Sequence, residues 1–205
     1  MSEIGLFPLD FVLVPGERAP LHVFEARYRE LIGECVEMDA EFGVVLAEEP
    51  GFRAVGTRAA VIDVTDRFPD GRMNVLVEGR GRFRVEQVTE GRPFATAQVE
   101  DLEDEDGAQD PSREETAQLL DAYRRVVEAA DAAPPELDLR AESLAFQIAA
   151  RVDFGTELKQ ELLESPSERE RTLQVASLLD AAVEAMQLQR TIKERAAGNG
   201  HVPEV

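Results

Sequence analysis

The feature that most constrains the fold is a run of acidic residues at positions 100–110, where seven of eleven side chains are carboxylates. Before this run, short apolar stretches alternate with Pro and Gly turn signals, a pattern that is typical of strands. After it, apolar residues recur every three or four positions, which is typical of helices. Carboxylates at this density repel one another and resist packing, so we expect a domain boundary here. The resulting division is a strand domain at 1–103, a linker at 104–111, a helical domain at 112–197 and a flexible tail at 198–205.

The first half is predicted to be a small, partly closed barrel of short strands with one embedded helix. Strands are expected at 6–14, 42–46, 55–68, 73–85 and 94–102, with a hairpin turn at Pro69-Asp70-Gly71. The alternation places Ala60, Ile62 and Val64 on one strand face, and Met73, Val75 and Val77 on another. Steps of three and four residues indicate a helix over 25–38 whose apolar face is Phe24, Tyr28, Leu31, Ile32, Cys35 and Met38.

The second half is predicted to be a helical bundle that ends in a long helix. Ser112 and Glu115 form a capping box at the start of a helix that ends before Pro134. Further helices are expected at 137–152 and 156–164, and the last begins at Ser165, with Pro166 in the first turn, and continues to residue 197. Its packed stripe is predicted to be Leu173, Ala176, Leu179, Val183 and Met186, and Leu188 and Ile192 extend an apolar edge beyond it. The fold class is therefore α+β.

Charge and composition exclude several functions. The formal net charge is −20, divided into −6 for residues 1–99 and −14 for the remainder, and such a field repels phosphate backbones and anionic lipid. We therefore expect nucleic-acid binding to be disfavoured, and we expect no membrane binding. A single cysteine, Cys35, fits a reducing compartment, and the sequence shows neither a secretion signal nor a membrane-spanning apolar run. We expect a cytoplasmic protein.

The residues needed for catalysis do not come together in this sequence. Of the two histidines, His201 lies in a Gly-flanked tail, so His22 is the remaining candidate for a catalytic triad, although a lone histidine is more often packed or hydrogen-bonded. Cys35 falls on the apolar face of the first helix, where a buried thiol is inert. No Cys/His spacing resembles a zinc site. We therefore predict no enzyme activity, no cofactor and no metal.

Three features are candidate binding surfaces. The first is the segment from Pro20 to Tyr28, where His22, Phe24, Arg27 and Tyr28 combine aromatic and polar character as peptide-contact surfaces often do. The alternative is that Phe24 and Tyr28 belong to the core, which we favour for Phe24. The second is the row Arg80, Arg82 and Arg84, which period-two spacing places on one strand face. The favoured alternative there is pairing with neighbouring glutamates such as Glu78, Glu86 or Glu100. The third is the apolar edge of the last helix, where Leu188 and Ile192 could meet a partner or remain in solvent.

Several motifs together resemble the N-terminal, substrate-recruiting domain of Lon-type ATP-dependent proteases, over roughly residues 4–197. They are Leu6-Phe7-Pro8-Leu9, Val14-Pro15-Gly16, the segment from Pro20 to Tyr28, Val55-Gly56-Thr57, Pro69-Asp70-Gly71, the run from Val75 to Gly79, the run from Lys159 to Glu164, and the helical end from Leu188 to Arg195. The resemblance implies a PUA-like β-barrel. The sequence contains no Gly-x-x-x-x-Gly-Lys-Ser/Thr loop, and its two lysines, Lys159 and Lys193, both lie in predicted helices, so neither a Lon ATPase nor a Ser–Lys peptidase site is present.

The function that we expect is therefore that of a stand-alone, non-catalytic module that binds unfolded or exposed polypeptide segments in a groove between its two halves, by burial of apolar surface. A protease or chaperone would be a further partner, and a second copy could pair through the last helix. Two alternatives stay open. PUA-like barrels include RNA readers, and a small molecule could bind near His22.

Overall fold

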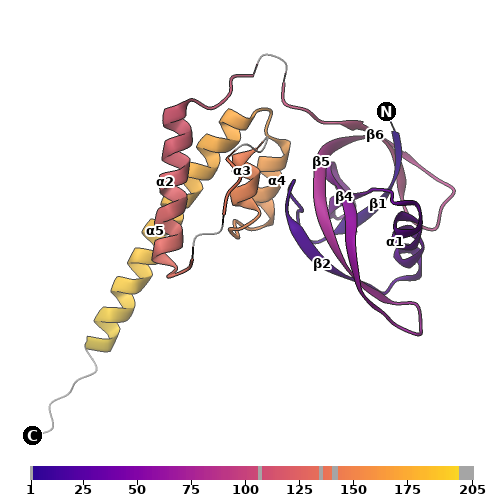
Figure 1. Ribbon diagram of the computed structural model, residues 1–205, viewed down its shortest axis with the longest axis horizontal. Helices are drawn as coiled ribbons and strands as arrows, with labels where there is room; N and C mark the ends of the chain where they lie inside the picture. Colours follow the sequence, from indigo (N-terminus) through magenta and orange to yellow (C-terminus); the bar gives the residue numbers. More distant parts are fainter. Residues whose placement is uncertain (1, 106–107, 134–135, 140–142, 199–205) are drawn as a thin grey trace, which may run out of the picture.

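A strand-rich half and a helical half lie side by side in the computed structural model, which describes residues 2–105, 108–133, 136–139 and 143–198 (Figure 1). The first half contains β1 (Ser2–Leu9), β2 (Arg18–Val23), α1 (Ala26–Met38), β3 (Phe42–Glu48), β4 (Gly51–Arg67), β5 (Met73–Thr89) and β6 (Thr96–Asp101). The second contains α2 (Arg113–Ala129), α3 (Leu144–Ala149), α4 (Thr156–Glu164) and α5 (Glu168–Gly198). In Figure 1, α3 and α4 lie nearest the strands, and α1 lies on the far side of the sheet. The predicted α+β class is confirmed.

The six strands form one sheet in the order β2-β5-β4-β3-β1-β6, and β6 also pairs with β5. This additional pairing closes a ring of hydrogen-bonded strands through β5, β4, β3, β1 and β6. Ser2 lies opposite Val99 where β1 meets β6, and Val85 lies opposite Val99 where β5 meets β6. The β1–β3 pairing is parallel and the other pairings are antiparallel. A closed ring leaves few strand edges unpaired, and β2 alone extends from it.

Strand β2 was missed by the sequence analysis, which treated this segment as loop and helix start. Its Pro20 is unusual in a strand, because proline cannot donate a hydrogen bond to a neighbouring strand. In the structure β2 pairs with β5 and no other strand, and an edge strand is where proline is tolerated. The strand predicted at 6–14 is also wrong at its end. β1 finishes at Leu9, and Val12 to Val14 are buried without being part of a strand.

The long hairpin of β4 and β5 follows its predicted turn but not all of its predicted faces. Gly71 adopts φ +85° in the turn, a conformation that glycine accepts without strain. The expected buried face of β5 (Met73, Val75 and Val77) is confirmed. The expected face of β4 (Ala60, Ile62 and Val64) is wrong, because three register shifts break the alternation of β4 against β5, and Val61 joins Val64 in packing against the core.

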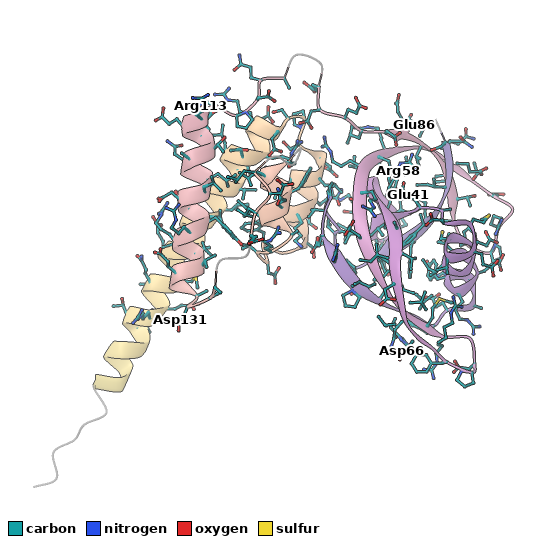
Figure 2. The ribbon with its side chains drawn as sticks, viewed as in Figure 1. Glu41, Arg58, Asp66, Glu86, Arg113 and Asp131 are labelled. Atoms are coloured by element: carbon teal, nitrogen blue, oxygen red, sulfur yellow. The ribbon has the colours of Figure 1, made fainter. Side chains whose placement is uncertain are left out.

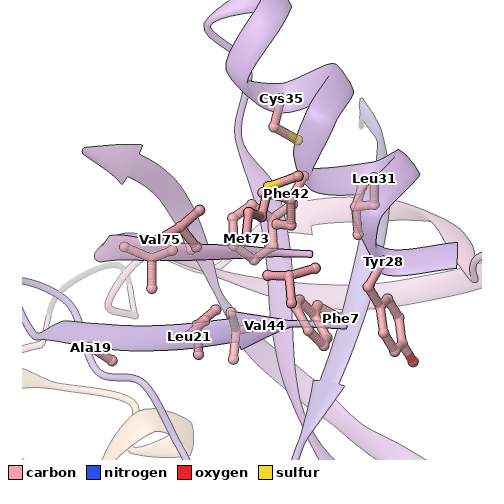
Figure 3. Close-up of a cluster of buried hydrophobic side chains, with 14 of the residues drawn as sticks. Phe7, Ala19, Leu21, Tyr28, Leu31, Cys35, Phe42, Val44, Met73 and Val75 are labelled. Carbon is pink, nitrogen blue, oxygen red and sulfur yellow. The ribbon is translucent and has the colours of Figure 1, made fainter. Parts of the chain in front are cut away.

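The core of the first half lies between α1 and the strands (Figure 3). Tyr28, Leu31, Ile32 and Cys35 are the buried residues of α1, as predicted. The other two members of the predicted apolar face are corrected, since Met38 is exposed at the last residue of the helix and Phe24 precedes its first residue and is 61% exposed.

The helical half confirms two predicted helix boundaries and corrects two. Ser112 and Glu115 form the expected capping box of α2, and α4 spans the predicted Thr156–Glu164. The helix predicted over 137–152 is reduced to α3, since residues 136–139 are not helical and 140–142 lie outside the described residues. The long helix begins later than predicted, because Ser167 rather than Ser165 accepts the hydrogen bond from the Glu170 N–H. The expected flexible tail, with His201, lies outside the described residues apart from Gly198.

The packed stripe of α5 is confirmed at Leu179 and Val183 and corrected at its start, where Val175 replaces Leu173. Val175, Leu179 and Val183 are buried, whereas Leu173 is exposed. Val175 and Leu179 belong to a cluster that also includes Val12, Val14, Leu46 and Val55 of the first half. The two halves therefore share one hydrophobic cluster. Polar contacts cross the same junction: Lys159 Nζ lies 2.7 Å from Glu17 Oε1, and Gln160 Nε2 donates to the Val55 carbonyl at 3.1 Å.

Candidate functional site

Four of the predicted binding residues surround one cavity of about 690 Å³ at an end of the sheet. His22 and Phe24 reach it from the end of β2, and Arg27 and Tyr28 from the start of α1. We refer to this cavity as the aromatic groove; its lining is Phe7, Pro8, Leu9, Asp10, His22, Phe24, Glu25, Arg27, Tyr28, Ala47, Gly51, Phe52 and Ala95. Most of these side chains are apolar, so the groove offers apolar surface to a ligand.

The inner wall of the groove is a rigid aromatic pair. The rings of Phe7 and Tyr28 are stacked, with centroids 4.1 Å apart and planes at 20° (Figure 3). The Arg27 guanidinium lies 4.5 Å from the centre of the Tyr28 ring and forms an ion pair with Glu25 at 2.9 Å. Burial raises the pKa of the Tyr28 hydroxyl, Arg27 lowers it and Glu25 raises it, with a net increase. Tyr28 is therefore a neutral hydrogen-bonding group at physiological pH.

Phe24 forms the exposed side of the groove. Its ring is stacked on that of His22 with centroids 6.0 Å apart. His22 Nδ1 lies 2.6 Å from Asn74 Oδ1, and Asn74 Nδ2 donates to Asp66 Oδ2 at 3.0 Å. Because Asn74 uses its N–H on Asp66, its oxygen faces His22, which assigns the proton of a neutral His22 to Nδ1 and leaves Nε2 as an acceptor. Asp66 is the second-last residue of β4 and lies near the hairpin turn in Figure 2, so these hydrogen bonds lie at the hairpin end of the strand.

The sequence analysis missed the residues that complete the groove. Phe7, Leu9 and Phe52 come from β1 and β4, which are distant in sequence from the Pro20–Tyr28 segment. Phe7 and Leu9 stood in a predicted strand, but nothing in the sequence indicated that its end would face the start of α1. The parallel pairing of β1 with β3 brings these elements together.

The arginine row is divided by the fold, so the predicted basic stripe is wrong. Arg80 is exposed and pairs with Glu78 at 2.6 Å, as the alternative anticipated for this residue, and Arg84 is exposed on the strand. Arg82 is buried, with a side chain 6% exposed. Gly79 lies opposite Ala59 and Arg82 lies opposite Thr57, so β5 has two residues, Arg80 and Gly81, where β4 has one. This bulge interrupts the period of two. The hypothesis of RNA binding therefore loses the continuous basic surface on which it depended.

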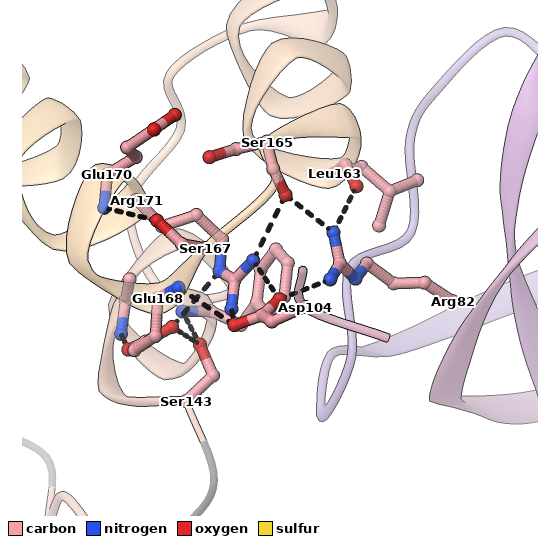
Figure 4. Close-up of polar contacts among 11 residues, drawn as sticks. Arg82, Asp104, Ser143, Leu163, Ser165, Ser167, Glu168, Glu170 and Arg171 are labelled. Carbon is pink, nitrogen blue, oxygen red and sulfur yellow. Dashed lines mark hydrogen bonds and ion pairs between the residues drawn. The ribbon is translucent and has the colours of Figure 1, made fainter. Parts of the chain in front are cut away.

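Arg82 instead belongs to an ion cluster between the two halves, which we refer to as the Asp104 latch (Figure 4). The Asp104 carboxylate accepts hydrogen bonds from Arg82 of β5 and from both terminal nitrogens of Arg171 of α5, the latter at 2.7 and 2.6 Å. Arg82 also donates to the carbonyls of Leu163 and Ser165, at 2.9 and 2.8 Å. The expectation that the acidic linker resists packing is therefore wrong at Asp104.

The geometry of the latch explains the pKa shifts of its members. Burial alone would raise the pKa of the Asp104 carboxyl, but hydrogen bonds and charge from Arg171, together with the charge of Arg82, lower it below its ordinary value. Burial, followed by the charge of Arg171, lowers the pKa of Arg82, and Asp104 opposes this. Arg171 is held from its other side by Glu168, whose carboxylate accepts from Arg171 Nε at 3.0 Å. The latch is thus a charge-paired cluster with both guanidiniums buried.

The cleft between the halves does not have the apolar character that we predicted for a client groove. It measures about 1050 Å³, and its lining includes Arg58, Arg80, Arg82, Arg171, Glu41, Asp101, Glu103 and Asp104. The apolar side chains at this junction, such as Val14 and Val55, are already buried within the shared cluster. The aromatic groove is therefore better suited than this cleft to bury the apolar side chains of a bound polypeptide segment.

The remaining predicted sites are placed as follows. Leu188 and Ile192 are exposed on α5, so the partner interface stays a prediction. The Cys35 thiol is buried, and burial, followed by the charge of Glu34, raises its pKa to about 11. No group of three or more His, Cys, Asp or Glu side chains in the described part of the chain is arranged to hold a metal ion. Among the same residues, none of the helices combines the length and apolar character that a membrane crossing requires.

Comparison with known proteins identifies the family. The protein-family model for the substrate-binding domain of ATP-dependent protease La (Lon) matches residues 3–181. The chain belongs to the Lon substrate-binding domain family. The match includes every residue of the aromatic groove and of the Asp104 latch, and it ends before Leu188.

Individual Lon relatives agree with this assignment. The Lon protease of Anaeromyxobacter dehalogenans is 30% identical over 96% of this chain and 25% of its own length, and that of Escherichia coli K12 is 25% identical over 94% and 26%. The chain thus spans about a quarter of the length of the Lon proteases that it matches. The crystal structure of a Lon N-terminal domain protein from Xanthomonas campestris superposes with a TM-score of 0.66 at 25% identity, covering 86% of this chain and 98% of that one. The N-terminal domain of a Mycobacterium avium complex Lon protease shares the fold, with a TM-score of 0.63 at 15% identity over 87% of this chain and 98% of that one.

Proposed function

We propose that this chain is a non-catalytic module that binds exposed polypeptide segments, and that the aromatic groove is the surface that holds them. The family is a substrate-binding one, and the matched region corresponds to the N-terminal part of Lon proteases rather than to their ATPase or peptidase parts. The proposal includes the assignment of the closed ring of strands as a PUA-like barrel. In this role the chain binds a segment without turnover, and a protease or chaperone acts on it afterwards.

The observation that carries the proposal is the exposure of Phe24. A phenylalanine that is 61% exposed, beside a groove of about 690 Å³ whose other walls are also apolar, is an arrangement suited to a partner rather than to internal packing. Fully burying a Phe side chain contributes roughly 1.5–3 kcal/mol. A ligand that covers the exposed part of Phe24 would therefore gain about 1–2 kcal/mol from this residue, or roughly five- to thirtyfold in Kd.

Fluorescence anisotropy with a short labelled peptide that carries one Phe in a Gly-Ser background tests this. We expect Phe24→Ala to raise Kd within that range, because the substitution removes a ring from the groove. The matched control is Val88→Ala, which truncates another exposed apolar side chain on β5, outside the groove. Equal effects of the two substitutions, or none of either, would refute the groove as the binding surface. Steady ATP hydrolysis or casein cleavage by the purified chain would refute the absence of turnover.

A further inference from the structure

We infer that the aromatic groove selects segments in which a bulky apolar side chain lies next to lysine or arginine, and that Asp10 determines this selection. The inference rests on the proposed function of the groove and specifies its substrate class. It follows from the balance of charge around the groove rather than from its apolar surface.

Three residues with a formal charge line the groove. Two of them, Glu25 and Arg27, form an ion pair with each other at 2.9 Å, and Arg27 also lies against the Tyr28 ring. Their charges therefore cancel locally. The third is Asp10, which is exposed immediately after β1, and no described side chain forms an ion pair or hydrogen bond with its carboxylate. In the formal count, in which histidine is neutral, the groove carries one uncompensated negative charge.

The remainder of the molecule adds to this local charge. The formal net charge of the chain is −20, and residues 1–99 alone carry −6. An acidic segment that approaches the groove is repelled by this field, whereas a basic segment is attracted to it. At moderate salt the long-range part is screened within about 10 Å, so that the contact with Asp10 dominates selection once a segment is seated.

The expected size of the effect is modest because the ion pair is exposed. One exposed pair alters affinity by up to about fivefold. Exchange of a favourable Lys for an unfavourable Glu in the ligand combines attraction with repulsion, so we expect about three- to tenfold between the two peptides.

The experiment uses three labelled peptides that share one Phe in a Gly-Ser background and differ in the adjacent residue, which is Lys, Gln or Glu. Anisotropy titrations at low salt should give affinities in the order Lys, Gln, Glu. Asp10→Asn should reduce the difference between the Lys and Glu peptides to less than twofold, and Asp10→Lys should invert the order. Added salt should compress the difference in the native chain.

The matched control is Glu86→Gln. It removes the same unit of charge from an exposed position on β5, outside the groove (Figure 2). If Glu86→Gln reduces the preference as much as Asp10→Asn, the overall charge of the chain selects the ligand and the role of Asp10 is overturned. If the peptides bind in a Phe24-dependent way but with equal affinities, this inference fails while the proposed function stands. If no peptide binds, the proposed function fails first. A thermal melt of each Asp10 variant by circular dichroism verifies that the fold is retained.

Discussion

Replacing Asp104 by alanine should destabilise the protein by about 2–4 kcal/mol. The carboxylate pairs with two guanidiniums whose side chains are 6% exposed (Arg82) and 3% exposed (Arg171), and removing one partner of a buried ion pair typically costs about 3–5 kcal/mol. We place the value toward the lower end for two reasons. Asp104 itself is 33% exposed, and each arginine keeps another acceptor, the carbonyls for Arg82 and Glu168 for Arg171. Even so, this is a large part of the roughly 5–15 kcal/mol by which domains are stable.

Urea unfolding followed by circular dichroism measures the change directly. Asp104→Asn should be milder than Asp104→Ala, because the amide keeps one oxygen that accepts from an arginine while the charge is lost. Asp121→Ala is the control for an exposed pair, since Asp121 and its partner Arg124 are both largely exposed on α2; it should cost less than 1 kcal/mol. If the free energy of unfolding of Asp104→Ala were within 1 kcal/mol of the native value, the latch would fix the arrangement of the two halves without adding to stability.

The same cluster predicts a specific acid dependence. The pKa of Asp104 is lower in the folded protein than its ordinary value near 3.8, so the folded state favours the ionised carboxylate. Its stabilisation is therefore present above that ordinary value and is lost as the pH falls through the folded pKa. In melting temperatures measured from pH 6 to pH 2, the loss at the acid end should be smaller for Asp104→Asn than for the native chain. An identical acid decline in both would contradict the lowered pKa.

Three further predictions concern the cores. Leu179→Ala should cost about 2–5 kcal/mol in a urea melt, because Leu179 is fully buried in the cluster shared by the two halves; less than 1 kcal/mol would mean that α5 is packed differently. Gly56→Ala should destabilise by about 1–3 kcal/mol in the same assay, since the added Cβ would lie 2.4 Å from the backbone oxygen of Val44; a neutral result would contradict the close approach of β4 to β3. The Cys35 thiol, with a pKa of about 11, should react with a disulfide reagent at pH 8 much more slowly in the native protein than in urea; equal rates would show that it is accessible.

Local signals in the sequence were sufficient for several elements. The capping box of Ser112 and Glu115, the turn at Gly71 and the limits of α4 each depend on a few adjacent residues, and each was predicted correctly. Where a distant partner determines the outcome, the prediction failed. β2 forms because β5 offers a strand to pair with, although Pro20 argues against it locally.

The candidate binding residues show the same division. His22, Phe24, Arg27 and Tyr28 were gathered correctly because they are adjacent in sequence, but the opposite wall with Phe52 was not. Arg82 was a candidate ligand-binding residue, with pairing to a neighbouring glutamate as the favoured alternative, and the structure instead buries it against Asp104. Whether an arginine on a strand faces solvent or a neighbouring domain depends on how the domains pack, which spacing does not encode.

Closure of the strand ring has a consequence for biosynthesis. Ser2 faces Val99, so β1 has no partner on that side until nearly a hundred further residues have been made. At about 5–20 residues per second, this delay lasts roughly 5–20 seconds. During that time the side of β1 that faces β6 is unpaired, although its other side can pair with β3, and the sheet cannot close by adding local hairpins. A nascent chain of this protein therefore passes through the exposed state in which, by our proposal, the finished protein binds others.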